Sequence, residues 1–471
     1  MSTEDPSPPP PKPSHPPGSW APARRAVVRA LAPVERFLAI EASSGVALLF
    51  TAAIALTWAN SPWAWAYQAL WHTKLGVSLG GVTFEKDLHF WVNDGLMTVF
   101  FFVVGLEIRR EASRGELSTP RRAALPLAAA FGGMLVPALV YVAFNAGGQA
   151  LRGWGVPMAT DIAFAVGIFA LLGPRISPAL RILLLALAVV DDVGAIVVIA
   201  LFYSAGLEPG GFFAMGVGMV VIFAMRLFGV RRPWLYVPAG AVVWAGALAA
   251  GVHPTLAGVV VGLMTPSKAW YSQRRFLDEV DAHLVALRGP EVEDERDLFP
   301  HLDALNVART EAVSPVERLQ HVLHTWVAFG VMPLFALANA GVPLGDASFD
   351  GDGLRVFLGV TVGLAVGKPV GVYVLARAAT RLGIALVPRG LSRRHLGVVG
   401  LAAGIGFTMA LFVATLAFEP GPLLETAKLG VLAGSGAAGL LTLLVGWRAL
   451  TPGIVPGAAT TAAEAEASTS A

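Results

Sequence analysis

Long apolar segments alternate with short polar ones along most of the chain. A helix needs about 20 apolar residues, at ~1.5 Å each, to cross a ~30 Å hydrocarbon core. Twelve segments meet this description, near residues 41–60, 89–108, 122–145, 156–172, 179–203, 210–227, 233–250, 254–265, 320–341, 354–380, 395–418 and 426–447. The pattern predicts an all-α membrane protein with twelve transmembrane helices, of which the eighth is short and tilted or partly buried.

Basic residues are concentrated in alternate loops. The basic loops and the N-terminal arm carry, among others, Arg24, Arg25, Arg29, Arg36, Arg109, Arg110, Arg114, Arg121, Arg122, Arg226, Arg231, Arg232, Arg377, Arg381, Arg393 and Arg394. Loops rich in Lys and Arg stay on the cytoplasmic side. Both termini are therefore expected in the cytoplasm, and an even number of spans agrees with that placement.

Composition supports a membrane protein bound to a lipid bilayer. The chain is 55% hydrophobic and 14% charged, whereas soluble proteins carry about 25% charged residues. A net charge of +2 gives no indication of a nucleic-acid partner. The lack of cysteine excludes disulfides, thiolate metal sites and cysteine catalysis.

Three regions are predicted from local composition. Residues 1–34 form a Pro-rich arm without the apolar core of a signal peptide, and residues 451–471 form a second polar tail; both are expected to be disordered and cytoplasmic. Residues 35–450 form the twelve-helix domain. Within it, the acid-rich segment 266–315 is expected to be a flexible polar cytoplasmic insert.

The loop after the first span contains a predicted β-hairpin. Alternating residues from Val77 to Phe84 flank Gly80 and Gly81, a pair typical of a two-residue turn. An isolated hairpin is only marginally stable in water. We therefore expect the Val77–Phe84 hairpin to have a partner.

Two adjacent carboxylates, Asp191 and Asp192, lie in the middle of an apolar run. A charge at the membrane centre costs roughly 2.5–3.5 kcal/mol on insertion scales. Neighbours on a helix point ~100° apart, so the two aspartates cannot face one partner. Lys368, deep in the tenth span, is the candidate counter-charge; the alternatives are a helix cap for the aspartates and a snorkelling lysine.

Two spans carry signals of interruption. Pro157 precedes Thr160 and Asp161 by three and four residues, and proline removes a helical hydrogen bond. The segment Gly404–Thr408 is a second weak point. Interrupted spans are typical of transporter sites at mid-membrane. Close helix packing for the glycines and a helix cap for Asp161 are the alternative interpretations. Asp94 is a further carboxylate at membrane depth.

Two clusters of titratable residues lie at predicted helix ends. Glu107, Arg110 and Glu111 share one helix face, and Arg318, His321 and His324 form the second cluster. Histidine titrates near neutral pH, which favours a pH-sensing entrance, although charged helix ends are more often simply solvated. Oxygen ligands suit hard cations such as Na⁺ or Li⁺, and no His/Cys cluster indicates a transition metal or another cofactor.

The motifs together resemble the NhaA family of bacterial sodium/proton antiporters. The matching segments are VNDGLM-x-VFFFVVGLEIRRE, ATDIAFAVG, LALAVVDDVGAI, GVHPTLAGV, GKPVGV and GIGFTMALFVA, in that order, between about Glu35 and Trp447. The resemblance implies two inverted repeats, two discontinuous helices that cross at mid-membrane, and a multi-pass protein of the bacterial inner membrane.

The resemblance also implies functional roles. Asp191 and Asp192 would bind Na⁺ or H⁺, Asp191 would pair with Lys368, and Thr160 and Asp161 would lie at the crossing. The expected activity is pH-regulated, electrogenic exchange of cytoplasmic Na⁺ or Li⁺ for external H⁺, by a transporter and not an enzyme. Glu107, Arg110, Glu111, Arg318, His321 and His324 match the family's pH-sensing entrance. The Val77–Phe84 hairpin would join a homodimer.

This chain departs from the family pattern in a few places. Gln320 stands where an acidic residue is common, Glu317 where lysine is frequent and Thr325 where proline is frequent. These changes affect the expected pH set-point rather than the ion site. An intramembrane aspartyl protease is disfavoured, because its two aspartates lie on separate helices and a GxGD motif is missing here. A channel is the other alternative.

Overall fold

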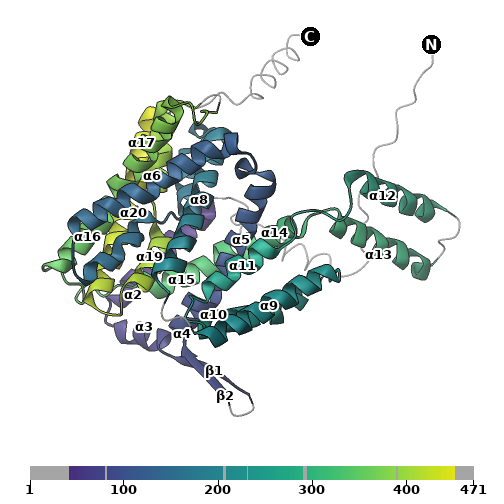
Figure 1. Ribbon diagram of the computed structural model, residues 1–471, viewed down its shortest axis with the longest axis horizontal. Helices are drawn as coiled ribbons and strands as arrows, with labels where there is room; N and C mark the ends of the chain where they lie inside the picture. The colour runs from purple at the N-terminus through teal and green to yellow at the C-terminus, as the bar shows by residue number, and fades with distance from the viewer. Residues whose placement is uncertain are drawn as a thin grey trace, which may run out of the picture.

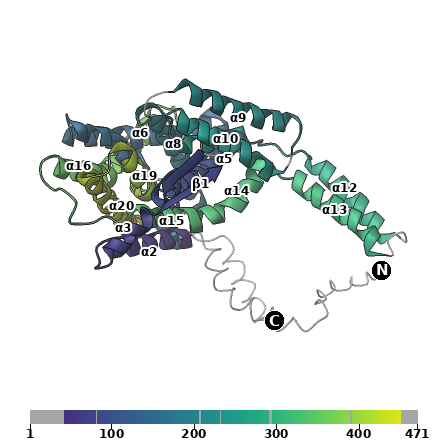
Figure 2. The same ribbon diagram turned by 90° about the horizontal axis from the view of Figure 1, so that it is seen from below.

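A computed structural model describes residues 42–79, 82–204, 208–230, 232–289, 294–388 and 391–450. Most of these residues form one helical bundle, from which a two-stranded hairpin and a pair of helices project (Figures 1 and 2). The predicted tails 1–34 and 451–471 lie outside the described residues, so their disorder and cytoplasmic location stay predictions.

The first half of the described chain runs from α2 to α10. Its elements are α2 (Ala42–Ala59), α3 (Ala64–Trp71), β1 (Lys74–Leu79), β2 (Val82–Asp87), α4 (Leu88–Phe90), the π-helix η1 (Trp91–Leu96), α5 (Met97–Arg114), η2 (Glu116–Ser118), α6 (Pro120–Phe144), η3 (Gln149–Met158), α7 (Ile162–Leu172), η4 (Gly173–Arg175), α8 (Pro178–Phe202), α9 (Pro209–Leu227), η5 (Pro233–Leu235) and α10 (Tyr236–Ala249).

The second half runs from α11 to α20. Its elements are α11 (Thr255–Met264), α12 (Gln273–Arg288), α13 (Glu295–Glu311), α14 (Pro315–Trp326), the π-helix η6 (Val327–Val331), α15 (Met332–Asn339), α16 (Asp352–Val362), the π-helix η7 (Gly363–Gly367), α17 (Lys368–Arg381), α18 (Arg393–Ala403), α19 (Phe407–Ala417) and α20 (Pro422–Ala449).

Many of these helices are long and apolar enough to cross a membrane. In the described part of the chain, seven continuous helical segments qualify, and the number rises to ten if each of three bent helix pairs is one span. Two shorter apolar helices cover Pro233–Ala249 and Thr255–Met264. The multi-pass membrane architecture is therefore supported, while the count of twelve spans stays a prediction.

Both predicted interruptions are present. Gln149–Met158 and Ile162–Arg175 meet at 44°, and Arg393–Ala403 and Phe407–Ala417 meet at 47°. At the first break Pro157 has no backbone N–H to donate, and the chain is extended at Ala159 and Asp161. A third bend of 113° separates α2 from α3. The first span was expected to end near residue 60, but the helix α3 lies in the stretch that was expected to be a loop.

Local sequence sets several helix starts. Ser177 caps α8 by accepting a hydrogen bond from the Leu180 N–H at 3.3 Å, and Pro178 is its first residue. Ser314 caps α14 in the same way, through the Glu317 N–H at 3.3 Å. Ser and Thr oxygens satisfy N–H groups that have no partner within the helix.

Helices α6 and α17 pack in close contact. A Cβ atom placed on Gly132 would lie 2.1 Å from the carbonyl oxygen of Gly371, which no side chain could tolerate. Glycine therefore lets the two backbones approach. This packing fixes α17, whose first residue is the predicted counter-charge Lys368.

The predicted hairpin forms. Strands β1 and β2 pair antiparallel, with Val77 opposite Phe84 and Lys74 opposite Asp87. Gly80 and Gly81 lie outside the described residues. The hairpin projects from one end of the bundle (Figure 1), while Phe84 meets Trp91 and Trp244 edge-on at its base. Its role in a dimer is untested.

The insert 266–315, predicted as a flexible polar segment, contains two helices. α12 and α13 run beside each other away from the bundle (Figures 1 and 2). His283 on α12 and His301 on α13 lie 3.1 Å apart through their Nδ1 atoms. The base of the insert is tied down because Glu311 O accepts the backbone N–H of Trp270 at 3.1 Å and of Tyr271 at 3.0 Å. The two helices α12 and α13 were not expected from the charged sequence of the insert.

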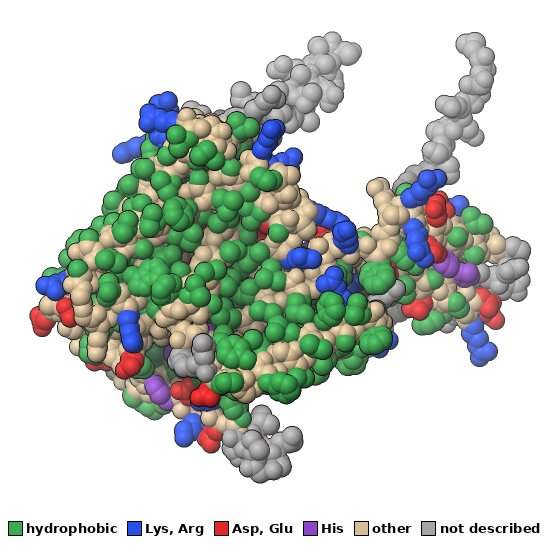
Figure 3. All heavy atoms as spheres, viewed as in Figure 1, with side chains coloured by type: hydrophobic (Ala, Val, Ile, Leu, Met, Phe, Trp, Pro, Cys, Tyr) green, Lys and Arg blue, Asp and Glu red, His purple; other side chains and the backbone are tan. Residues whose placement is uncertain are grey.

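The outer surface of the bundle is broadly apolar. Exposed large residues include Phe50, Phe131, Leu139, Leu201, Phe213, Val220 and Val237. Figure 3 shows hydrophobic side chains across the face of the bundle, with Lys, Arg, Asp and Glu gathered toward its margins. Such a surface is stable against lipid and not against water.

Candidate functional site

The intramembrane ion pair joins α8 and α17. Asp191 Oδ2 lies 2.9 Å from Lys368 Nζ, and both side chains are fully buried. Lys368 Nζ also donates to the backbone carbonyl of Met158, at the end of η3. Lys368 follows directly after the π-helical segment η7. The lysine therefore lies against α8 and against the first broken span, as a structural counter-charge and not as a snorkelling side chain.

Thr160 connects the aspartate to both breaks. Its hydroxyl lies 2.6 Å from Asp191 Oδ2 and 3.0 Å from the carbonyl oxygen of Ala403, where α18 ends. The backbone N–H of the next residue, Asp161, donates to the carbonyl of Ile405 at 2.7 Å. The two interrupted spans thus contact each other at their unwound residues.

Asp161 binds the N-termini of two half-helices. Its Oδ1 accepts the Phe164 N–H at 3.0 Å and so caps α7. Its Oδ2 accepts the Thr408 N–H at 3.1 Å and the Thr408 hydroxyl, at the start of α19. A carboxylate at a helix N-terminus offsets the partial positive charge there. The geometry shows the helix cap that was one interpretation of Asp161 from the sequence. The carboxylate caps both α7 and α19.

Asp192 is placed differently from its neighbour. It is buried on α8, at 3% exposure, and it is not a member of the ion pair with Lys368. The second oxygen of Asp191, Oδ1, is buried without a hydrogen-bond partner in the described structure. The ion pair with Lys368 thus engages one carboxylate oxygen of Asp191 and leaves the other oxygen, and Asp192, outside it.

Helix α8 is continuous through both aspartates, so neither of them caps a helix. Three participants were not identified from sequence: the Met158 carbonyl, the Ala403 carbonyl and Ser435. Ser435 Oγ accepts the N–H groups of Gly406 at 3.2 Å and of Phe407 at 2.9 Å. A lone serine in α20 gives no local signal of this role, because its partners are 28 and 29 residues away.

Asp94 lies apart from this cluster. It belongs to the π-helix η1, and its Oδ1 is 3.4 Å from His253 Nε2. The other ring nitrogen of His253 is 2.8 Å from the Thr255 hydroxyl. The indole N–H of Trp244 donates to the Asp94 carbonyl at 3.0 Å. Asp94 therefore has a neighbourhood of its own, and within the described residues it forms no hydrogen bond or ion pair with Asp191 or Asp192.

The two predicted entrance clusters lie on neighbouring helices, α5 and α14, which pack together. Arg110 lies 3.2 Å from Glu111 and 3.9 Å from Glu107. Arg114 on α5 lies 3.6 Å from Glu317 on α14, an ion pair joining the clusters. Gln320 Oε1 is buried without a hydrogen-bond partner among the described residues. His321 and His324 are on the same helix, α14.

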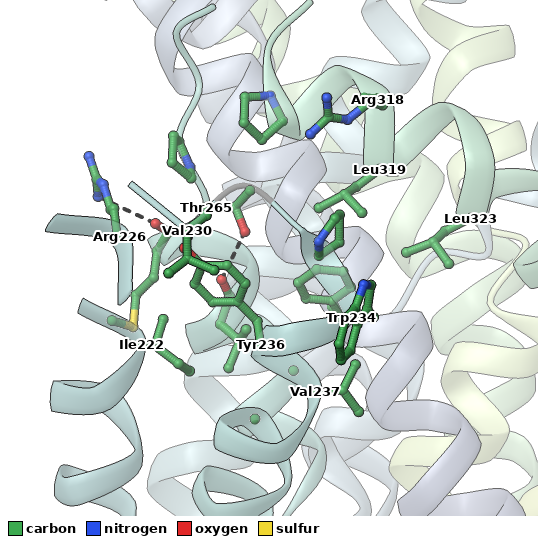
Figure 4. A pocket seen from close by; sticks show the side chains of 18 of the residues that line it. Ile222, Arg226, Val230, Trp234, Tyr236, Val237, Thr265, Arg318, Leu319 and Leu323 are labelled. Carbon is green, nitrogen blue, oxygen red and sulfur yellow. Dashed lines mark hydrogen bonds between the residues drawn. The ribbon is translucent and has the colours of Figure 1, made fainter. Parts of the chain in front are cut away.

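Arg318 turns toward the insert. Its guanidinium donates to the Thr310 carbonyl, at the end of α13, at 3.0 Å. It also lines an apolar cavity of about 460 Å³ between α5, α10, α11 and α14, shown in Figure 4 with Trp234, Leu319 and Leu323. Of the predicted sensor residues, Glu107, Arg110 and Glu111 belong to an ion-pair network, and Arg318 lines a cavity.

The donor set at the aspartates suits a hard cation. It consists of carboxylate oxygens, a threonine hydroxyl and carbonyl groups at broken helix ends, all of which are oxygen atoms. Within the described ranges no group of three or more His, Cys, Asp or Glu residues is arranged as a metal centre. A cation at this position would therefore be held by few protein charges.

Comparison with known proteins places the chain in a family of antiporters. Residues 35–445 match the family described as Na+/H+ antiporter 1. The chain is 54% identical to "Na(+)/H(+) antiporter NhaA 2" of Sorangium cellulosum, over 96% of this chain and 98% of that protein. It is 53% identical to the protein of the same name from Myxococcus xanthus, over 98% of each chain.

A relative in Pseudomonas putida, also called "Na(+)/H(+) antiporter NhaA 2", is 49% identical over 90% of this chain and 94% of its own length. The chain belongs to the Na+/H+ antiporter 1 family. The family resemblance inferred from the motifs is confirmed, and the relatives that show it are named as antiporters.

Proposed function

We propose that this protein exports cytoplasmic Na⁺, or Li⁺, in exchange for external H⁺ by electrogenic antiport, and so maintains cytoplasmic pH and sodium. Its relatives are named Na⁺/H⁺ antiporters, and the similarity to them extends over nearly the whole chain. A bacterial inner membrane, with both termini in the cytoplasm, is the setting that the distribution of basic loops favours.

The observation that carries the proposal is the free carboxylate capacity inside the bundle. Asp191 Oδ1 is buried without a hydrogen-bond donor among the described residues, and Asp192, the next residue of α8, is buried at 3% exposure. A carboxylate left in this state is stable if it binds either a proton or a cation. One site that takes either cargo, but not both, is what antiport requires.

Exchange then follows from competition and alternating access. Facing the cytoplasm, Na⁺ binds the aspartates and displaces protons; facing outward, protons displace Na⁺. Lys368 compensates Asp191 when no cation is present, through the 2.9 Å ion pair. Each cycle would move net charge if two protons leave for one Na⁺: one from the Asp192 carboxyl and one from the Asp191–Lys368 pair, whose proton lies on the lysine while no cation is bound. The aspartates titrate together, and their protonation belongs to the pair.

The contact between the two breaks supports a movable site. Unwound backbone at Ala403 and Ile405 meets Thr160 and Asp161, and Asp161 neutralises two helix N-termini. We infer that these spans are the family's two crossing helices, within a twelve-span inverted-repeat fold. In that fold the two shorter apolar helices also cross the membrane.

Two further parts of the proposal concern regulation and assembly. The Glu107, Arg110, Glu111 and Glu317 network lies at the ends of α5 and α14, where protonation would change the packing of these helices. This network, together with Arg318, His321 and His324 on α14, is the proposed pH sensor. The projecting β1–β2 hairpin is the proposed contact between two copies of the chain.

Everted membrane vesicles provide the test. With a proton gradient in place, adding Na⁺ should release protons from vesicles that contain the full chain. Asp191→Asn and Asp192→Asn should each abolish this release while the protein remains in the membrane fraction. Asp352→Asn is the matched control, because Asp352 is an exposed residue paired only with Arg355 at 3.4 Å. Wild-type exchange in either site variant would refute the proposal.

A further inference from the structure

A second cavity lies between α17 and α18, away from the aspartates. Its volume is about 430 Å³, within the range of small-molecule sites. Its wall contains three arginines, three hydroxyl-bearing residues and three aliphatic residues: Arg377, Arg381, Arg393, Tyr373, Thr380, Ser392, Val387, Leu391 and Leu396. These arginines also belong to the basic loops that are expected on the cytoplasmic side.

The cavity has an uncompensated positive charge. No Asp or Glu belongs to its wall, and none of the three guanidinium groups forms an ion pair with a carboxylate in the described part of the chain. Elsewhere, by contrast, Arg110, Arg114 and Arg355 each have an acidic partner. Three like charges around one space repel each other unless an anion lies between them.

The position of Arg393 adds to this charge. It is the first residue of α18, an eleven-residue helix capped by Ser392. A helix N-terminus carries a partial positive charge and free N–H groups, which favour anions. Arginine is the residue best suited to phosphate, because its planar guanidinium makes two parallel hydrogen bonds to the phosphate oxygens. Three arginines and the start of α18 thus border the same space.

We propose that this cavity binds a phosphate group, carried either by an anionic phospholipid or by a small phosphate compound. The cavity lies at the end of two apolar helices on the basic side of the chain, where a lipid headgroup would meet it. Val387, Leu391 and Leu396 supply an apolar wall beside the arginines. This inference concerns a site separate from the aspartates and does not depend on the proposed exchange.

Such a ligand would hold together two elements that both lead to the aspartates. α17 begins with Lys368, and α18 ends with Ala403, whose carbonyl accepts the Thr160 hydroxyl. The two helices already touch closely: a Cβ on Gly400 would lie 2.9 Å from the Pro369 carbonyl oxygen. A phosphate group bridging Arg377 and Arg393 would therefore stabilise this packing from the far end.

Ligand-dependent stabilisation of the purified full-length chain tests the proposal. The thermal midpoint is followed by tryptophan fluorescence while dioleoylphosphatidylglycerol is titrated into the micelles, with phosphatidylcholine as the uncharged comparison. Inorganic phosphate is titrated separately against sodium chloride of equal ionic strength. Arg377→Gln/Arg393→Gln is compared with Arg394→Gln, which removes a charge from the same helix start but does not line the cavity.

We expect phosphatidylglycerol or phosphate to raise the midpoint of the wild type and of Arg394→Gln. The double variant should need at least about tenfold more ligand for half the effect, because charge-assisted hydrogen bonds are lost. Protection by phosphatidylglycerol alone identifies a lipid headgroup, and protection by inorganic phosphate identifies a free phosphate compound. Equal ligand dependence in all three proteins would overturn the proposal, and so would an equal loss in Arg394→Gln.

The variant Arg377→Lys/Arg393→Lys is a second control, used in case the glutamine variant does not fold. It keeps both positive charges but loses the paired hydrogen bonds of the guanidinium groups. We expect ligand dependence between that of the wild type and that of the glutamine variant. If the lysine variant folds normally and its ligand dependence equals that of the wild type, guanidinium recognition is excluded and the proposal is wrong.

Discussion

Removing Lys368 should destabilise the protein strongly, because it leaves a buried carboxylate uncompensated. In the wild type Lys368 Nζ lies 2.9 Å from Asp191 Oδ2, and both side chains are fully buried. Lys368→Met keeps a similar chain length and takes away the charge. Breaking a buried pair by removing one partner typically costs roughly 3–5 kcal/mol. The Met158 carbonyl also loses its donor, which adds to this cost.

The double variant Lys368→Met/Asp191→Asn separates charge from packing. Replacing both members of a buried pair by neutral groups is often close to neutral in stability. We therefore expect a thermal midpoint in detergent that falls by several degrees in Lys368→Met and recovers substantially in the double variant. Light-scattering and size-exclusion profiles check that each protein is folded before heating. If the two single effects simply add in the double variant, the residues do not interact and the reasoning is refuted.

Three further outcomes follow from the same contacts. Asp161→Ala should lower the thermal midpoint more than Thr408→Val does. The alanine variant removes the cap of α7 and also leaves two buried donors of Thr408 without an acceptor, and each unpaired donor costs about 1–3 kcal/mol. Equal effects of the two variants would contradict this prediction. Deleting Gly76–Phe84 should give monomers in detergent, as measured by mass photometry. The deleted protein should still exchange Na⁺ for H⁺ in vesicles. A persistent dimer would place the interface elsewhere. Gln320→Glu adds a carboxylate to the helix that carries His321 and His324, and a nearby negative charge favours a charged imidazole. The pH at half-maximal exchange should therefore rise, while the maximal rate stays nearly unchanged. An identical pH profile would mean that this helix end is not a sensor.

The features predicted well from sequence depend on local signals. Pro157 marked the first break, and Gly404 with Gly406 marked the second, because both residue types weaken a helix wherever they stand. The hairpin register followed from alternation around a glycine pair. The buried charges were found because apolar surroundings make any carboxylate conspicuous.

The features that were missed depend on distant contacts. Ser435 serves two N–H groups 28 and 29 residues away, and Lys368 reaches a carbonyl 210 residues away. No local pattern specifies such partners. The short helix α3, after the 113° bend, was also missed, because its eight residues are too few to be recognised as a span and lie in a predicted loop. In the insert, charged residues obscured the helical periodicity of α12 and α13.

The partners of the arginines likewise could not be predicted from sequence. Counting basic residues oriented the chain but could not show which arginines have acidic partners. Arg114 pairs with Glu317, whereas Arg377 and Arg393 face a cavity without a carboxylate. Only the folded arrangement distinguishes a paired arginine from one available to an anion.

Proton release on Na⁺ binding tests the central claim most directly. Purified protein in weakly buffered detergent solution is mixed with NaCl, or with choline chloride as control, and a pH-sensitive dye reports the protons released. The account predicts release by the wild type on Na⁺ addition and little or none by Asp192→Asn, whose side chain can neither hold a proton nor compete for one. No Na⁺-dependent release from the wild type, or full release from Asp192→Asn, would contradict competition at the paired aspartates.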